Sequence, residues 1–142
     1  METSAQIGIQ YSGFRFKSFS FREPSGVGEN ESFNFETSMA IRTANDRIII
    51  GLMILVNRKS DGATYAKAET ESLFLAKGLE QAVDRVGNIN VPENLLFTVI
   101  SLAISTSRGA LMVKGAGTFL EKMPMPIVDP QSFFQRNKAV NQ

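Results

Sequence analysis

The sequence contains neither cysteine nor histidine. The lack of cysteine excludes disulfides, thiolate metal sites and cysteine nucleophiles, and it fits a reducing compartment. The lack of histidine removes the usual general base and the commonest ligand of zinc and other transition metals. We therefore expect a cytoplasmic protein that is not an enzyme, with no catalytic residues, no metal and no cofactor.

A surplus of one charge sign is also missing. The chain has 15 Lys and Arg residues against 14 Asp and Glu residues, so its formal net charge is +1. This balance gives no global attraction to nucleic acid or to an anionic membrane. The N-terminus shows no basic region followed by an apolar one, so we expect no signal peptide. The longest uncharged apolar run, Leu95 to Ser107, is too short to span a bilayer, so no membrane insertion is expected.

Hydrophobic residues make up 43% of the chain and charged residues 20%, which is typical of a globular protein. The length of 142 residues fits one domain and suffices for a sizeable core. We expect a single domain over residues 1–142, ordered over about residues 7–135. Residues 136–142 form a polar tail that should fray.

The run from Arg47 to Val56 is apolar on both faces of the strand that it predicts. Its even positions are Ile48, Ile50, Leu52, Ile54 and Val56, and its odd positions include Ile49, Met53 and Leu55. A strand with one solvated face alternates apolar and polar residues, and antiparallel sheets in small domains usually keep such a face. We therefore expect another subunit or a bound polypeptide to cover the second face of this strand.

A long first strand is predicted from Gln6 to Phe21, but its apolar alternation changes phase twice. Ser12-Gly13 fits a β-bulge at the first change, because glycine inside a strand often marks one. The second change has two interpretations, a further bulge or aromatic side chains on both faces. The aromatic residues either pack in the core or form a surface offered to a partner.

Two further strands are predicted on either side of the isoleucine-rich run. Residues 33–43 alternate cleanly, and residues 65–75 place Lys67, Glu69 and Glu71 on an exposed side. The short segments between these runs suit hairpin turns, so the three strands should form an antiparallel meander. The polar loop over residues 23–30 is too long for a tight hairpin and should cross over other strands.

A helix is predicted from residue 91 to at least Arg108, reaching as far as Lys114 before the glycine at position 115. Pro92 suits its first helical position, and Asn90 is a possible cap. Apolar side chains wrap most of its circumference, which predicts burial on all sides. Serines such as Ser101 and Ser105 would let a neighbouring element approach closely. This helix is a second element that needs more cover than one small domain provides.

The segment from Met123 to Pro130 cannot be helical, because each proline disfavours the helical region in the residue before it. We expect an extended apolar segment that lies on the rest of the molecule. Asp129 can cap a short final helix that begins at Pro130 and buries Phe133 and Phe134.

No motif in the chain predicts chemistry. The glycines between Gly109 and Gly117 fit neither a phosphate loop nor a dinucleotide fingerprint and indicate a helix end. Glu69 and Glu71 could work as an acid–base pair, but a solvated strand face explains them more simply. A basic patch could bind RNA with the phenylalanines as stacking platforms, although the near-zero net charge argues against it. That patch would consist of Arg15, Lys17, Arg42, Arg47, Arg58 and Lys59. Abundant Phe and Met and surplus apolar surface point instead to a binding protein.

The order of these elements resembles the SecB-type (protein-export chaperone SecB-like) family. Phe14 to Pro24 resembles the family's first strand running into its crossover loop, and Phe33 to Leu75 resembles strands two to four. The helix ending around Ser107-Arg108-Gly109 is similar to the family's first helix and its Ser-Arg-Gly signature. Met123 to Phe134 is similar to the extended Leu/Pro segment and the final helix. The resemblance covers about residues 7–135.

This resemblance implies an α+β fold, a four-stranded antiparallel sheet with a crossover loop and then a meander. One long and one short C-terminal helix would pack on one face. It also implies a homotetramer, a dimer of dimers with helices between sheets. The implied function is that of an ATP-independent holdase, which keeps unfolded or precursor proteins export-competent and passes them to the SecA motor.

The charge pattern departs from that family. Members that serve SecA are strongly acidic and present a negative sheet face, whereas this sheet carries Arg42, Arg47, Arg58, Lys59 and Lys67. The tail used for the motor is short as well. This departure argues against SecA docking. It leaves open a SecB-like chaperone dedicated to an antitoxin or another specific client, and a structural or RNA-binding oligomer.

A client-binding surface should use aromatics beyond those that one core face requires, together with the methionine-rich segment. We expect it to comprise Phe14, Phe16, Phe19, Phe21, Phe33, Phe35, Met123, Met125 and Ile127. The oligomer interface should use the second face of the isoleucine-rich strand and the long helix. We expect it to comprise Ile49, Met53, Leu55, Leu96, Ile100, Ser101, Ile104 and Ser105.

Overall fold

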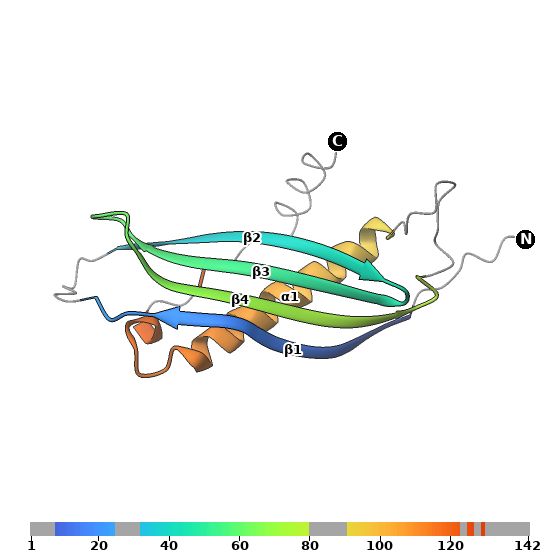
Figure 1. Ribbon diagram of the computed structural model, residues 1–142. Helices are drawn as coiled ribbons and strands as arrows, with labels where there is room; N and C mark the ends of the chain where they lie inside the picture. The colour runs from blue at the N-terminus through green and yellow to red at the C-terminus, as the bar shows by residue number, and fades with distance from the viewer. Residues whose placement is uncertain (1–7, 25–31, 80–90, 123–124, 127–128, 130–142) are drawn as a thin grey trace, which may run out of the picture.

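The computed structural model describes residues 8–24, 32–79, 91–122, 125–126 and 129. Within these residues one four-stranded antiparallel sheet, with strand order β1-β4-β3-β2, carries a long helix diagonally across one face (Figure 1). The elements are β1 (Gly8–Phe21), β2 (Phe33–Ala44), β3 (Arg47–Arg58), β4 (Thr64–Lys77), α1 (Glu93–Lys114) and the 3-10 turn η2 (Phe119–Lys122). The predicted α+β fold is confirmed.

The turn chemistry explains the meander from β2 to β4. Asn45 has φ 57° and Gly62 has φ 72°, values in the left-handed region that tight hairpins require. The chain goes from β1 at one edge of the sheet to β2 at the opposite edge, as the predicted crossover requires. Pro92 stands one residue before the first helical residue of α1 and not inside its first turn.

The core lies between α1 and the central strands. Ile48, Ile50, Leu52, Ile54 and Val56 of β3 are at most 2% exposed. They face α1, whose buried residues include Ile100 and Ile104. On the opposite side of the sheet, Ile49, Met53 and Leu55 are only half-buried, and no described element lies over them (Figure 1). We call this side the outer face. The two-sided apolar strand is therefore real, and the described part of the chain covers only one of its sides.

Two β-bulges in β1 determine where its aromatic side chains point. The pairing with β4 shifts between Tyr11 and Gly13 and again between Phe16 and Ser18, so Ser12 and Lys17 are the extra residues. Each extra residue reverses the alternation of side chains. As a result, the aromatics of β1 all pair with β4 residues on the helix side of the sheet. The first predicted bulge is confirmed, and the second phase change is also a bulge.

The helix α1 is buried on one side only. Its sheet-facing side includes Val99, Ala103 and Leu111, whereas its other side leaves Phe97, Leu102, Met112 and Val113 between 41% and 78% exposed. The single chain therefore covers only one side of α1, and burial of the other side against a partner stays a prediction. By length and composition α1 could cross a membrane, but here it packs along a sheet as a core helix.

A buried hydroxyl pair fixes α1 on the sheet. The Oγ1 atom of Thr70 on β4 and the Oγ atom of Ser107 on α1 are 2.8 Å apart, and both residues are at most 2% exposed. Because an unpaired buried hydroxyl costs free energy, this contact fixes the position of α1 along β4.

Tight packing ends α1 as predicted. A Cβ atom at Gly115 would lie 2.7 Å from the Cβ of Leu120, so the turn into η2 accepts only glycine without rearrangement. Further along, the Nε atom of Arg108 donates a hydrogen bond to the carbonyl of Met125 at 2.7 Å. The predicted cap at Asp129 involves a helix over residues that the structure does not describe.

Candidate functional site

The most continuous apolar feature outside the core is a row of four phenylalanines on β1, which we call the aromatic stripe: Phe14, Phe16, Phe19 and Phe21. Consecutive ring centroids are 5.5, 5.8 and 5.8 Å apart, within the range of favourable aromatic pairs. The first three side chains are half-buried and Phe21 is 45% exposed. The stripe is therefore ordered and still open to contact.

The position of α1 leaves only part of the stripe open. Among the described elements, α1 packs mainly over β3 and β4, the two central strands. The C-terminal end of α1 nevertheless crosses β1 (Figure 1) and brings Lys114 near Phe16 and Phe19, so the stripe is only partly open. Phe16 and Phe19 rest partly on the core below them, while Phe14 and Phe21 do not belong to it. An extended peptide could lie along this edge with its apolar side chains on the stripe.

A cation lies at the rim of the stripe. The Nζ atom of Lys114, the last residue of α1, is 5.8 Å from the ring centroids of both Phe16 and Phe19. This geometry fits a weak cation–π contact, and it holds the ammonium group beside apolar surface. The stripe therefore combines apolar contact with one positive charge at its edge.

The predicted aromatics of β2 pack beside other rings at the opposite edge of the sheet. The ring of Phe33 lies 5.3 Å from that of Phe119 and 6.1 Å from that of Tyr65. Tyr65 is in turn covered by the guanidinium groups of Arg22 and Arg58, at 4.2 and 4.5 Å from its ring centroid. Phe35 packs against the same part of the core. Phe33 and Phe35 are half-buried, as Phe14, Phe16 and Phe19 of the stripe are.

The methionine-rich segment is only partly described. Met125 is 1% exposed and belongs to the core, so its side chain is not accessible to a client in this structure. Met125 was predicted to belong to the client-binding surface. That prediction is wrong in this structure, because Met125 packs against the core beneath η2. Met123 and Ile127 lie outside the described residues.

The residues predicted for the oligomer interface fall on three different places. Ile100 and Ile104 are at most 4% exposed and face the sheet of their own chain, so no second chain can contact them. Leu96 is half-buried beside them. On the far side of α1, Ser105 is exposed, and Ser101 donates a hydrogen bond to the carbonyl of Phe97. The remaining three residues, Ile49, Met53 and Leu55, lie on the outer face.

The sequence interpretation missed a buried acid on the outer face. Glu71 was expected to be exposed, but it is 5% exposed and lies between two arginines from other strands. The Nε atom of Arg15 on β1 and the Nη2 atom of Arg42 on β2 each donate to it at 2.7 Å. The hydrogen bond from Arg15 is the main reason that the pKa of Glu71 is lowered, against the opposing effect of burial.

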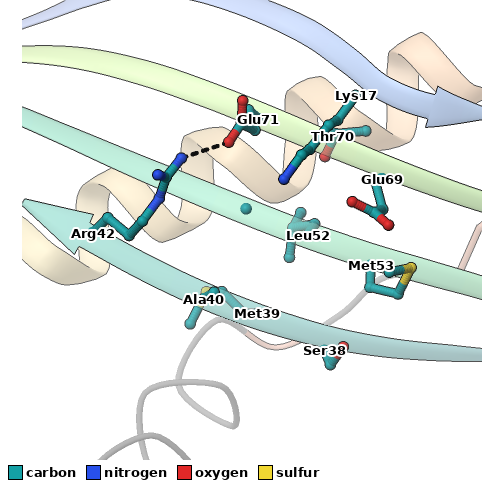
Figure 2. A pocket seen from close by; sticks show the side chains of 11 residues that line it. Lys17, Ser38, Met39, Ala40, Arg42, Leu52, Met53, Glu69, Thr70 and Glu71 are labelled. Atoms are coloured by element: carbon teal, nitrogen blue, oxygen red, sulfur yellow. Dashed lines mark hydrogen bonds and ion pairs between the residues drawn. The ribbon is translucent and has the colours of Figure 1, made fainter.

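This ionic cluster crosses three strands because β3 has a glycine at its centre. Gly51 pairs with Glu71 on one side and with Ala40 on the other, so the side chain of Arg42 passes over β3 unobstructed (Figure 2). Around it lies a shallow depression of roughly 240 Å³. In the sequence, the burial of Glu71 could have been inferred from a Glu opposite a Gly on the neighbouring strand. That inference needs the strand register, which the sequence alone does not give.

The described residues offer contact surface more than reactive groups. Among them, no group of three or more acidic side chains lies close enough to hold a metal ion. Arg58 of the patch proposed for RNA binding packs on Tyr65, but two other positive side chains of that patch are separated from the aromatic stripe. Arg15 and Arg42 lie on the outer face and bind Glu71, whereas the aromatic stripe lies on the helix side.

No family model matches the chain, and no curated protein matches its sequence. Among solved structures, the fold is similar to the Rv1957 SecB-like chaperone of Mycobacterium tuberculosis, in complex with a ChAD peptide from the HigA1 antitoxin. The similarity has a TM-score of 0.62 at 11% sequence identity and covers 85% of this chain and 90% of that one. It shows that this chain has a SecB-like fold, as the resemblance predicted.

Proposed function

We propose that this protein is a SecB-like chaperone that binds an extended apolar segment of another polypeptide along the aromatic stripe, without ATP. The observation that supports it most is the stripe itself. Four phenylalanines stand in a row on an edge strand, oriented by two bulges and still partly exposed. A strand edge supplies backbone pairing to an extended peptide, and neighbouring side chains supply apolar contacts.

A client of restricted identity fits this chain better than a general role in export. The solved neighbour with the same fold binds a peptide from an antitoxin. In addition, the outer face here carries several cations, whereas the resemblance associates SecA docking with a strongly acidic face. We therefore propose a dedicated client, such as an antitoxin, as the first candidate. Holding precursor proteins for export is the second.

Assembly through the exposed side of α1 is part of the proposal. Phe97, Leu102, Met112 and Val113 form apolar surface on the side of the helix that faces away from the sheet. Ser105 lies on that side too and would let a second helix approach closely. Burial of such a side between copies would give a homo-oligomer, proposed here as a dimer of dimers in the cytoplasm.

The test is client binding measured beside stability. The full chain should suppress aggregation of an unfolded protein at stoichiometric amounts without nucleotide. Phe14→Ala and Phe21→Ala should weaken binding by about 1–2 kcal/mol while leaving the melting temperature nearly unchanged. Leu55→Ala on the outer face is the matched control and should retain binding. If every variant that loses binding also unfolds, the stripe is structural and the proposal fails.

A panel of clients separates the two candidates. Several unrelated unfolded proteins and an array of short peptides would be tested under the same conditions. Equal protection of all unfolded proteins would favour the general holdase. Binding of one peptide sequence, with poor protection of the panel, would favour the dedicated client.

A further inference from the structure

The outer face of the sheet contains two apolar areas separated by a polar centre. Ile49 is paired with Leu73 at one end of β3, and Met53 and Leu55 lie toward the other end. Gly51 stands between them. All four of these apolar side chains are half-buried in the single chain, and no described element covers them. This pattern gives a surface with apolar contacts on both sides of a central depression.

The outer face as a whole has an excess of positive charge. The charged side chains of the outer face are Arg15, Lys17, Arg42, Arg47, Lys67, Lys77, Glu36, Glu69 and Glu71. Glu71 is already engaged by Arg15 and Arg42, so one carboxylate serves two cations. Lys17 adds a further charge to the lining of the depression, because the second bulge turns this extra residue to the outer side (Figure 2).

We propose that the outer face binds an acidic amphipathic helix of a partner protein, separately from client binding at the aromatic stripe. A sheet face cannot extend its own hydrogen-bond ladder, so a helix or a second sheet covers it in folded proteins. Ile49 and Met53 are four residues apart on β3. At a rise of ~3.3 Å per residue, the two apolar areas are therefore about 13 Å apart along the strand. Apolar side chains eight residues apart on a helix span about 12 Å, with a position halfway between them on the same side.

The residue halfway between the two apolar residues of the partner helix would lie over the central depression, so the side chains lining the depression determine which residue type is favourable there. A Glu or Asp there would reach the region between Arg42 and Lys17, which line the depression together with Glu69 and the already engaged Glu71. A Lys or Arg at the same position would meet those cations at close range, which is unfavourable. The expected partner helix therefore carries apolar, acidic and apolar residues in that order along one side.

A protein partner fits this face better than RNA. Sequence-independent binding of single strands uses aromatic side chains on which bases stack. The aromatics of β1 and β2 lie on the helix side of the sheet, so the charged centre of the outer face has none from these strands. Aliphatic side chains flank the charges instead, and these pack against a helix.

The proposal is tested with the full-length protein and three synthetic helical peptides. Each peptide carries leucines eight residues apart, and the residue halfway between them is Glu, Gln or Lys. Fluorescence anisotropy should show the Glu peptide binding about fivefold more tightly than the Gln peptide, with the Lys peptide weakest. Lys17→Glu should reverse the order of the Glu and Lys peptides. Gly51→Val should weaken all three, because it fills the depression.

Two controls keep the result specific. Phe14→Ala should leave peptide binding unchanged while weakening client binding, and Lys17→Glu should leave client binding unchanged. A single-stranded RNA oligonucleotide is measured in parallel. The proposal is overturned if the Glu and Lys peptides bind with equal affinity, or if no peptide binds measurably. It is also overturned if RNA binds more tightly than the peptides and this RNA binding depends on Lys17. None of these outcomes decides whether the aromatic stripe binds clients.

Discussion

The two faces of β3 differ although their residues are nearly alike. Ile48 and Ile50 on the helix side are 0% exposed, whereas their neighbour Ile49 on the outer face is half-buried and lies close to charged groups. On the helix side the chain supplies its own cover. On the outer face it supplies apolar residues together with a bridged ionic cluster. A run that is apolar on both faces therefore combines a finished core with a surface still available to a partner.

The largest effect should separate these two faces directly. Ile50→Ala removes a fully buried side chain and should lower the free energy of unfolding by about 2–5 kcal/mol. Ile49→Ala, the matched change one residue away, should lower it by about 1 kcal/mol or less, because part of that side chain is already in water. Urea denaturation of both variants gives the comparison. Equal losses would mean that the outer face is covered in solution.

The helix α1 also has a buried side and an exposed apolar side, and a charged substitution tests whether the exposed side is an interface. Ser105→Asp places a carboxylate on the exposed side of the helix. If copies meet there, the unpaired charge becomes desolvated and assembly should weaken by at least about 2 kcal/mol. Light scattering over a dilution series would show the change. A wild-type mass of 15.6 kDa at micromolar concentration would contradict assembly altogether.

A smaller effect should distinguish the two edges of the helix-side surface. Phe21→Ala on the open stripe should change stability by about 1 kcal/mol or less, because the side chain is 45% exposed. Phe33→Ala, in the cluster with Tyr65 and Phe119, should cost more. Thermal melting of both variants checks the order. A reversed order would show that the stripe is the more structural of the two aromatic groups.

The smallest effect should appear in the pH dependence. The pKa of Glu71 is lowered from its ordinary value of 4.5 by its arginine partners, so the folded state binds this proton less readily than the unfolded state. Its stabilisation is therefore present above about pH 4.5 and is lost as the pH falls further toward the folded-state pKa. Glu71→Gln should reduce stability at neutral pH by about 1 kcal/mol and flatten the acid side of the stability profile. An unchanged acid profile would show that the pair is not maintained in solution.

The sequence predicted local structure well where one residue type decides it. Asn45 and Gly62 at their turns, the alternation of β2 and the glycine after Lys114 each gave a strand or helix boundary close to the observed one. The strand order also followed, through the length of the loop between β1 and β2 and through the resemblance. These features depend on neighbours in the chain and on common turn chemistry.

What the sequence could not give depends on residues far apart in the chain. Glu71 seemed exposed because its own strand alternates, yet Arg15 and Arg42 arrive from two other strands to bury it. The two sides of α1 are similarly apolar, so periodicity alone could not say which one meets the sheet. Met125 became a core residue through its packing beneath η2. Of the candidate client site, the aromatic stripe on β1 and the half-buried Phe33 and Phe35 of β2 remain partly exposed among the described residues.

The two bulges in β1 have another consequence, which concerns how the protein avoids polymerising. A long, regular and apolar edge strand would accept the edge of a second copy and could seed a fibril. Ser12 and Lys17 interrupt the regular pairing of the strand at two points, and Lys17 adds a charge at one of them. The edge therefore presents no long uninterrupted template to another copy of itself, while short stretches remain for the client proposed above. The proposed function is to hold chains that are prone to aggregate. The two bulges reduce the tendency of this protein to aggregate through its own edge strand.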